Sequence, residues 1–143
     1  MKVLYEDNHI IAVSKTCHEI VQGDKTGDTP LSDTVKAYIK EKYNKPGNVF
    51  CGLVHRIDRP VSGAVIFAKT SKALARMNKI VQERNITKIY WALVENAPEQ
   101  PEGRLVHFMK KNEALNKSVA INEEKKEYQR AELEYKVLGK SRN

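Results

Sequence analysis

One carboxylate stands out in this sequence. The segment HRIDRPVSG, residues 55–63, places Asp58 between Arg56 and Arg59 and follows the second arginine with Pro60. Pro60 fixes its own φ angle and disfavours helical backbone in the residue before it, so we expect an extended and stiff segment. A neighbouring guanidinium favours the ionised form of a carboxyl group. A charged carboxylate in a fixed position is a usable nucleophile or general base.

In an extended segment, alternate side chains share a face. Arg56 and Asp58 are therefore predicted to project to one side, and His55 and Ile57 to the other, towards the apolar runs that flank the motif. Gly63 permits a sharp turn with a positive φ angle. The pattern leaves two interpretations open, because Asp58 could be a chemical group or could form a surface ion pair with Arg56 beside a turn.

Hydrophobic patterns predict the strands that position this segment. Residues 2–15 predict two short strands around a turn at residues 6–8, and the continuous apolar run at 10–13 predicts that the second strand is buried on both faces. The segment NVFCGLVH at 48–55 is expected to be a strand that leads into the motif. The segment GAVIFAK at 63–69 is expected to be a strand that leaves it.

Two helices are predicted beside these strands. The first is expected to be capped by Thr29, with Pro30 in its first position, and to end at Pro46–Gly47. The second is expected to be capped by Ser71 and to end at Asn85. Their predicted apolar faces consist of Leu31, Val35, Tyr38 and Ile39 in the first helix and of Leu74, Met77, Ile80 and Val81 in the second.

The remainder of the chain carries strand patterns. The run TKIYWALVE at 87–95 alternates, which predicts a strand with Trp91 in the core and Tyr90 on the opposite face. Further strands are predicted at 104–109, 117–121 and 130–139, with a solvated turn or hairpin tip at 123–128. The predicted fold class is therefore α+β, with a mixed, mainly antiparallel sheet and helices packed on it.

Composition limits the functions that this chain can have. Lys and Arg outnumber Asp and Glu by 25 to 18, and the net charge of +7 favours a polyanionic partner such as nucleic acid. Two cysteines without metal-ligand spacing, and three scattered histidines (His9, His18 and His107), predict neither a disulfide framework nor a metal site. Neither a signal peptide nor a membrane span is recognisable, so we expect a cytoplasmic protein without a membrane partner. His55 is expected to be a hydrogen-bonded structural residue.

Three segments resemble motifs of one family. The stretch GLVHRIDRPVSGAVIFAKT at 52–70 resembles the central motif of the RluA-type pseudouridine synthases, in which HR-[LI]-D carries the catalytic aspartate. The stretch KIYWALVE at 88–95 resembles the second family motif, with its active-site tyrosine. The stretch LYEDNHIIAVSK at 4–15 resembles the opening hairpin of the family. The resemblance covers nearly the whole chain.

The resemblance implies an enzyme that isomerises uridine in ribosomal or transfer RNA to pseudouridine without a cofactor. Asp58 would be the catalytic nucleophile or base, and Tyr90 would stack on the target base and help to remove its C5 proton. Arg56 would fill the space that the flipped base leaves. Arg59 and Lys88 would also contact RNA. The alternatives are an RNA-binding fragment or homologue without turnover and, with less support from the charge, a small-molecule hydrolase.

The sequence also departs from the family pattern. Lys15–Thr16 stands where the family has Lys-Pro, and Val61 stands where it has threonine. A later family motif, GR-x-HQIR, supplies a basic partner for the aspartate and does not follow YKVLGKSRN at the end of this sequence. We therefore expect residues 1–143 to form one catalytic domain, incomplete at its C-terminal end and without a separate N-terminal RNA-binding domain. The whole enzyme is expected to be a monomer, whereas an exposed strand edge at 130–139 could let this chain self-associate.

Overall fold

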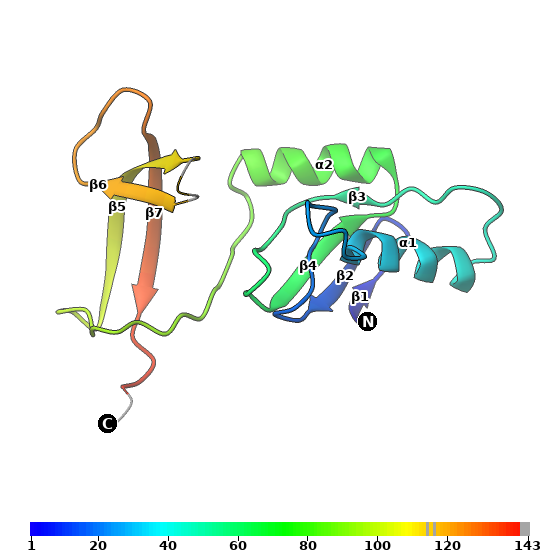
Figure 1. Cartoon of the computed structure of the whole chain (residues 1–143), viewed down its shortest axis with the longest axis horizontal. Coiled ribbons are helices and arrows are strands. Elements are labelled where there is room, and N and C mark those ends of the chain that lie inside the picture. Colours follow the sequence, from blue (N-terminus) through cyan, green and yellow to red (C-terminus); the bar gives the residue numbers. More distant parts are fainter. Residues whose placement is uncertain (114, 116, 141–143) are drawn as a thin grey trace. The chain divides into compact units, whose positions relative to one another are not determined.

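The computed structural model of the protein describes residues 1–113, 115 and 117–140 (Figure 1). Two compact units, Met1–Ile89 and Tyr90–Asn143, are described here one at a time. Each contains an antiparallel sheet, and the two helices α1 (Leu31–Lys42) and α2 (Ser71–Gln82) lie in the first, which confirms the predicted α+β class. The expectation of a single incomplete domain stays a prediction. Among the described residues, we find no helix that combines the length and the apolar character needed to cross a membrane.

The first unit is built on a four-stranded antiparallel sheet. Its strands, in the order in which they lie side by side, are β1 (Lys2–Glu6), β2 (Ile10–Lys15), β4 (Gly63–Ala68) and β3 (Gly52–Leu53). The predicted hairpin of β1 and β2 is confirmed. The Asp7 carboxylate closes its turn by accepting hydrogen bonds from the backbone N–H groups of His9 and Ile10, at 2.7 and 2.8 Å. β3 is much shorter than the apolar run at 48–55 indicates.

Two helices cover this sheet, α1 (Leu31–Lys42) and α2 (Ser71–Gln82). Because side chains alternate along β4, Val65 and Phe67 point to the side of α1, whereas Ala68 points to the side of α2. The larger core cluster consists of Ile11, Val13, Val21, Leu31, Val35, Ile39, Val65 and Phe67. The smaller cluster consists of Val54, Ala68 and Ala73, with Leu74, Met77 and Val81 packed against it. Both predicted apolar helix faces thus face the sheet.

Both helix caps differ from the predictions. Pro30 occupies the N-cap position of α1 in extended conformation, and Thr29 does not cap the helix. The backbone N–H groups of Leu31 and Ser32 instead donate to the carbonyl oxygens of residues 20 and 21, at 2.8 and 3.1 Å. These bonds satisfy donors that a side-chain cap would otherwise serve. The cap of α2 is Thr70 rather than Ser71, because the Thr70 hydroxyl accepts a hydrogen bond from the backbone N–H of Ala73 at 3.1 Å.

The prediction that β2 is buried on both faces is wrong. Ile11 and Val13 are fully buried on the α1 side, but Ile10 and Ala12 on the other face are only partly buried. An apolar run in sequence shows that neither face is strongly polar. It does not show that two layers of structure cover the strand.

The second unit contains a three-stranded antiparallel sheet. Its strands, again in spatial order, are β6 (Lys117–Ile121), β5 (Glu102–Asn112) and β7 (Gln129–Lys136). These three strands confirm the predictions at 104–109, 117–121 and 130–139, and the exposed turn at 123–128 joins β6 to β7 as expected. Side chains here are mostly exposed or partly buried, including Leu105, Met109 and Leu133.

The predicted strand at 87–95 is absent from the structure. This segment has no regular secondary structure, and Trp91, which the alternation placed in the core, is 87% exposed. Alternation describes a strand only when a neighbouring strand supplies hydrogen bonds and another layer covers the apolar face. Neither condition is met for these residues in the described structure. The prediction that Trp91 is a core residue is therefore also wrong.

Candidate active site

The Asp58 motif links β3 to β4 as an extended segment that ends in a turn. Arg56 and Asp58 are exposed, whereas His55 and Ile57 are partly buried, which confirms the predicted alternation. Ile57 packs against the larger core cluster. The turn is closed by a hydrogen bond of 3.0 Å from the backbone N–H of Val61 to the carbonyl oxygen of Asp58.

His55 connects the motif to the sheet. Its Nε2 atom accepts a hydrogen bond of 3.2 Å from the backbone N–H of Ile66 in β4. Burial lowers the pKa of His55, and the nearby positive charge of Lys88 lowers it further. The neutral imidazole is the form that can accept this bond. His55 is therefore hydrogen-bonded behind the motif, as predicted.

Sequence reasoning missed the residue that fixes the turn. Lys15 lies at the end of β2, on the buried face that also carries Ile11 and Val13, and is only 1% exposed. Its Nζ atom donates hydrogen bonds to carbonyl oxygens of the turn, at 3.1 Å for Asp58, 2.9 Å for Arg59 and 2.7 Å for Val61. A further bond of 3.0 Å joins it to the carbonyl oxygen of Thr16. The signal that could have revealed Lys15 is a lysine in register with buried apolar residues.

Burial lowers the pKa of Lys15, because a charged ammonium loses hydration inside the protein. The four carbonyl oxygens replace that hydration. Lys15 thereby ties the end of β2 to three residues of the turn. This contact and the hydrogen bond from the backbone N–H of Val61 together hold the backbone of Asp58.

The two departures from the family pattern have local explanations. Thr16, where the family has proline, donates its backbone N–H and its hydroxyl to the Glu19 carboxylate at 2.7 and 2.9 Å. Proline could not make the first of these bonds. Val61 contributes through its backbone, which contacts Asp58 and Lys15 and does not depend on the side chain.

Arg59 contacts another part of the first unit. Its Nη2 atom contacts the loop between β2 and α1, donating to Asp28 Oδ2 at 2.7 Å and to Thr26 Oγ1 at 2.9 Å. Asp24 Oδ2 lies 3.7 Å from the same nitrogen. Within residues 1–89, the Asp58 carboxylate itself takes part in no ion pair, with Arg56 or with any other residue. The unit therefore presents an exposed carboxylate on a fixed backbone.

Two other candidate residues, Lys88 and Tyr90, lie on either side of the boundary between the two units. Lys88 lies at the end of the first unit, and its charge acts on His55. Tyr90 is the first residue of the second unit and is 61% exposed. The role of Tyr90 at the target base stays a prediction, as do the RNA contacts of Arg56, Arg59 and Lys88.

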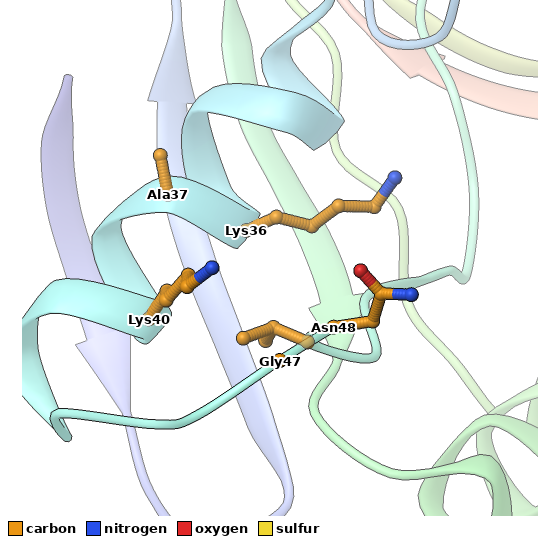
Figure 2. A pocket seen from close by; sticks show the side chains of 6 residues that line it. Lys36, Ala37, Lys40, Gly47 and Asn48 are labelled. Carbon is orange, nitrogen blue, oxygen red and sulfur yellow. The ribbon is translucent and has the colours of Figure 1, made fainter.

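Over residues 1–113, 115 and 117–140, no group of three or more His, Cys, Asp or Glu side chains could hold a metal ion. A pocket of about 330 Å³ lies between α1 and the loop that follows it. Figure 2 shows side chains that line it. Its lining consists of Lys36, Ala37, Lys40, Gly47, Asn48 and Val49, and it contains none of the predicted site residues.

Comparison with known proteins decides the family. The sequence profile of the RNA pseudouridylate synthases matches residues 9–143. The chain belongs to this family. The resemblance of residues 52–70 to the RluA-type synthases is thereby confirmed.

The relatives of this chain include curated synthases and a solved structure. The mitochondrial pseudouridylate synthase RPUSD4 of Xenopus tropicalis is 31% identical over 104 residues, 73% of this chain and 32% of that protein. The ribosomal large subunit pseudouridine synthase C of Buchnera aphidicola is 37% identical over 93 residues, 65% of this chain and 28% of that protein. The chain thus spans about a third of the length of such relatives.

The structure of human RNA pseudouridylate synthase domain containing 4 has the same fold. It matches with a TM-score of 0.78 and 18% sequence identity, over 98% of this chain and 54% of that one. At this identity the likeness supports the fold alone.

Proposed function

We propose that this protein isomerises uridine in RNA to pseudouridine and that Asp58 is its catalytic group. The observation that carries the proposal is an exposed carboxylate, without an ion pair among residues 1–89, on a turn that Lys15 fixes from behind. This arrangement lies within the residues that match the RNA pseudouridylate synthase family. A fixed carboxylate that is open to a ligand suits nucleophilic or base catalysis.

The proposed reaction is an isomerisation, so the product has the same composition as the substrate. The bond between C1′ of the ribose and N1 of uracil breaks, the base turns, and C5 bonds to C1′. The C5 atom then loses its proton, and N1 carries a proton in the product. Asp58 either attacks C1′ and forms an ester that breaks when C5 bonds to C1′, or removes a proton from the sugar as uracil leaves and returns it when C5 adds. Both routes use a single carboxylate.

The remaining residues have proposed roles in reaching the base. A uridine in structured RNA must leave its stack before Asp58 can act on it, which costs a few kcal/mol. Arg56 shares the exposed face of the motif with Asp58 and would occupy the vacated position. Tyr90 would stack on the extruded base and assist removal of the C5 proton. Lys88 and Arg59 would contact the phosphate backbone.

We propose ribosomal or transfer RNA as the substrate, in the cytoplasm. The Buchnera relative is named for the large ribosomal subunit, which favours ribosomal RNA. Turnover on purified ribosomal RNA and on purified transfer RNA, measured side by side, distinguishes the two classes.

Tritium release from RNA that contains 5-tritiated uridine tests the activity, because the C5 proton is lost only when the base is isomerised. The assay is run with residues 1–143. Asp58→Asn is nearly isosteric and removes the charge. It should lower turnover by at least about a hundredfold, with RNA binding changed by no more than about threefold.

The matched control is Asp33→Asn, which removes an exposed carboxylate from α1, where Asp33 pairs with Lys36 at 3.0 Å. This variant should keep its activity. RNA binding without tritium release in the unmutated protein would support the alternative, an RNA-binding protein of the same fold without turnover.

A further inference from the structure

The contact between Arg59 and the loop at residues 24–28 is not explained by the proposed chemistry. Arg59 follows Asp58 directly, yet its guanidinium bonds to Asp28, 31 positions earlier in the chain, and to Thr26. Thr26 also hydrogen-bonds to Asp24 through both its backbone N–H and its hydroxyl. Two carboxylates and a hydroxyl from one loop thus converge on a single guanidinium beside the candidate catalytic carboxylate.

This loop has little else to hold it in place. All side chains from residue 22 to residue 29 are exposed, so no apolar burial fixes the loop. The backbone of Arg59 is held in place, because Lys15 donates a hydrogen bond of 2.9 Å to its carbonyl oxygen. Arg59 therefore links a fixed turn to a loop that depends on it.

The contact is also weak enough to be exchanged. The Arg59 side chain is 38% exposed and the Asp28 side chain 56% exposed. Exposed ion pairs contribute little to stability. A guanidinium binds phosphate as readily as carboxylate, with the same forked geometry. An RNA phosphate brought close to Asp58 can therefore compete for Arg59.

We propose that Asp24 and Asp28 form a latch on Arg59 that an RNA phosphate opens. In the free protein the two carboxylates occupy the guanidinium and hold the loop at 24–28 against the Asp58 turn. In the complex the guanidinium turns to a phosphate, and the loop is released. The latch rests on the proposed function, because it requires RNA at Asp58. It gives Arg59 two successive partners and makes the loop carboxylates determinants of RNA affinity.

The first experiment measures the affinity for a fluorescein-labelled RNA stem-loop with uridines in its loop, by fluorescence anisotropy. Asp28→Asn frees Arg59 in advance and should tighten binding about three- to tenfold, the range that corresponds to about 0.7–1.4 kcal/mol. Asp33→Asn is the matched control, since it removes the same charge from an exposed ion pair on α1. It should change the affinity by less than twofold.

Asp28→Asn both frees Arg59 and removes a negative charge that repels RNA. A background without the Arg59 guanidinium separates these two effects. In Arg59→Ala, the substitution Asp28→Asn should tighten binding no more than Asp33→Asn does. An equal gain from Asp28→Asn with and without Arg59 would mean that the carboxylate acts only through general repulsion, and would overturn the latch.

Hydrogen exchange of the backbone amides at residues 24–28 is the second measurement. These amides should exchange faster in Arg59→Ala than in the unmutated protein, and faster in the unmutated protein with the stem-loop than without it. Slower exchange on RNA binding would contradict release of the loop.

The outcomes distinguish this proposal from the proposed function. If the unmutated protein binds the stem-loop but Asp28→Asn and Asp33→Asn behave alike, only the latch is overturned. If the unmutated protein binds no RNA, both proposals fail. If RNA binds, the latch behaves as expected and tritium is not released, the latch stands and the catalytic role of Asp58 fails.

Discussion

Lys15 and Asp58 show that the exposed and the buried side of the motif have separate tasks. The carboxylate of Asp58 is exposed and takes part in no ion pair among residues 1–89, whereas its carbonyl oxygen is held by Val61 and Lys15. Hydrogen bonds to the backbone thus fix the position of Asp58, and its side chain remains accessible to a ligand. An ion pair with Arg56 would have engaged the carboxylate instead.

We predict that Lys15→Met destabilises the fold and impairs the function of Asp58. Methionine fills a similar volume, but it leaves carbonyl oxygens of Arg59, Val61 and Thr16 without the donor that satisfied them. An unsatisfied buried group costs about 1–3 kcal/mol, so the free energy of unfolding should fall by roughly 2–4 kcal/mol. Urea denaturation followed by circular dichroism measures this change.

Lys40→Met is the control, because Lys40 is an exposed lysine of α1. It should change the free energy of unfolding by less than about 0.5 kcal/mol. Equal stability of the two variants would show that the hydrogen bonds of Lys15 do not hold the turn.

For single residues, the sequence predicts the part of the site that follows from the geometry of an extended backbone. Alternation around Pro60 gave the exposed face of Arg56 and Asp58 correctly. The Lys15 contact could not be predicted, because a lysine on a buried face is unfavourable unless the fold brings carbonyl oxygens to it. Those oxygens lie more than 40 positions away in the chain.

In the first unit, several secondary-structure elements are connected by hydrogen bonds to one carboxylate, that of Glu6 at the end of β1. The Glu6 side chain is 8% exposed and takes hydrogen bonds from Lys42 and Lys69, both at 2.7 Å. The hydroxyls of Tyr43 and Tyr38 donate to it at 2.7 and 3.0 Å. The network joins β1 to α1 and to the residue that follows β4.

The Glu6 network should make stability depend on pH in a defined window. Burial by itself would raise the pKa of Glu6, but its hydrogen bonds outweigh burial and lower the pKa to about 2. A carboxyl whose pKa is lower in the folded than in the unfolded state stabilises the fold above its unfolded pKa. The free energy of unfolding should therefore fall as the pH drops from about 4.5 to about 2.

Glu6→Gln should remove most of this dependence. Glutamine cannot balance the two ammonium groups, so the variant should also lose about 1–3 kcal/mol at pH 7. Thermal unfolding measured between pH 2 and pH 7 tests both effects. Glu83→Gln, which removes a more exposed partner of Lys79, should retain the pH dependence. A variant of Glu6 with the unmutated pH profile would contradict this assignment.

The sequence predicts correctly those elements that form from local interactions. Helices α1 and α2 and the hairpin of β1 and β2 depend on local periodicity and turn chemistry, and their existence was correct. The strand at 87–95 was wrong, because a strand requires a partner that sequence periodicity does not supply. The cap of α1 was wrong for a similar reason, since carbonyl groups at residues 20 and 21 serve its first N–H groups.

For the whole molecule, apolar burial is concentrated in one unit. Over the described residues, every fully buried hydrophobic side chain lies between Ile11 and Ala73. The sheet of β5, β6 and β7 carries large apolar side chains that remain exposed, among them Leu105 and Leu133. Composition gave the average apolar content of the chain correctly but could not show this uneven distribution.

We therefore predict that the two units differ in independent stability. A chain of residues 1–89 should unfold cooperatively in urea, because it retains both core clusters, the Lys15 contact and the Glu6 network. A chain of residues 90–143 should show no cooperative transition, because a three-stranded sheet needs a covered hydrophobic face to be stable alone. Circular dichroism and the dispersion of amide resonances measure both.

A sharp transition of residues 90–143 as a monomer would show that strand pairing between β5 and its neighbours suffices to stabilise this unit. The same transition seen only at high protein concentration would instead show that the exposed apolar side chains are covered by self-association.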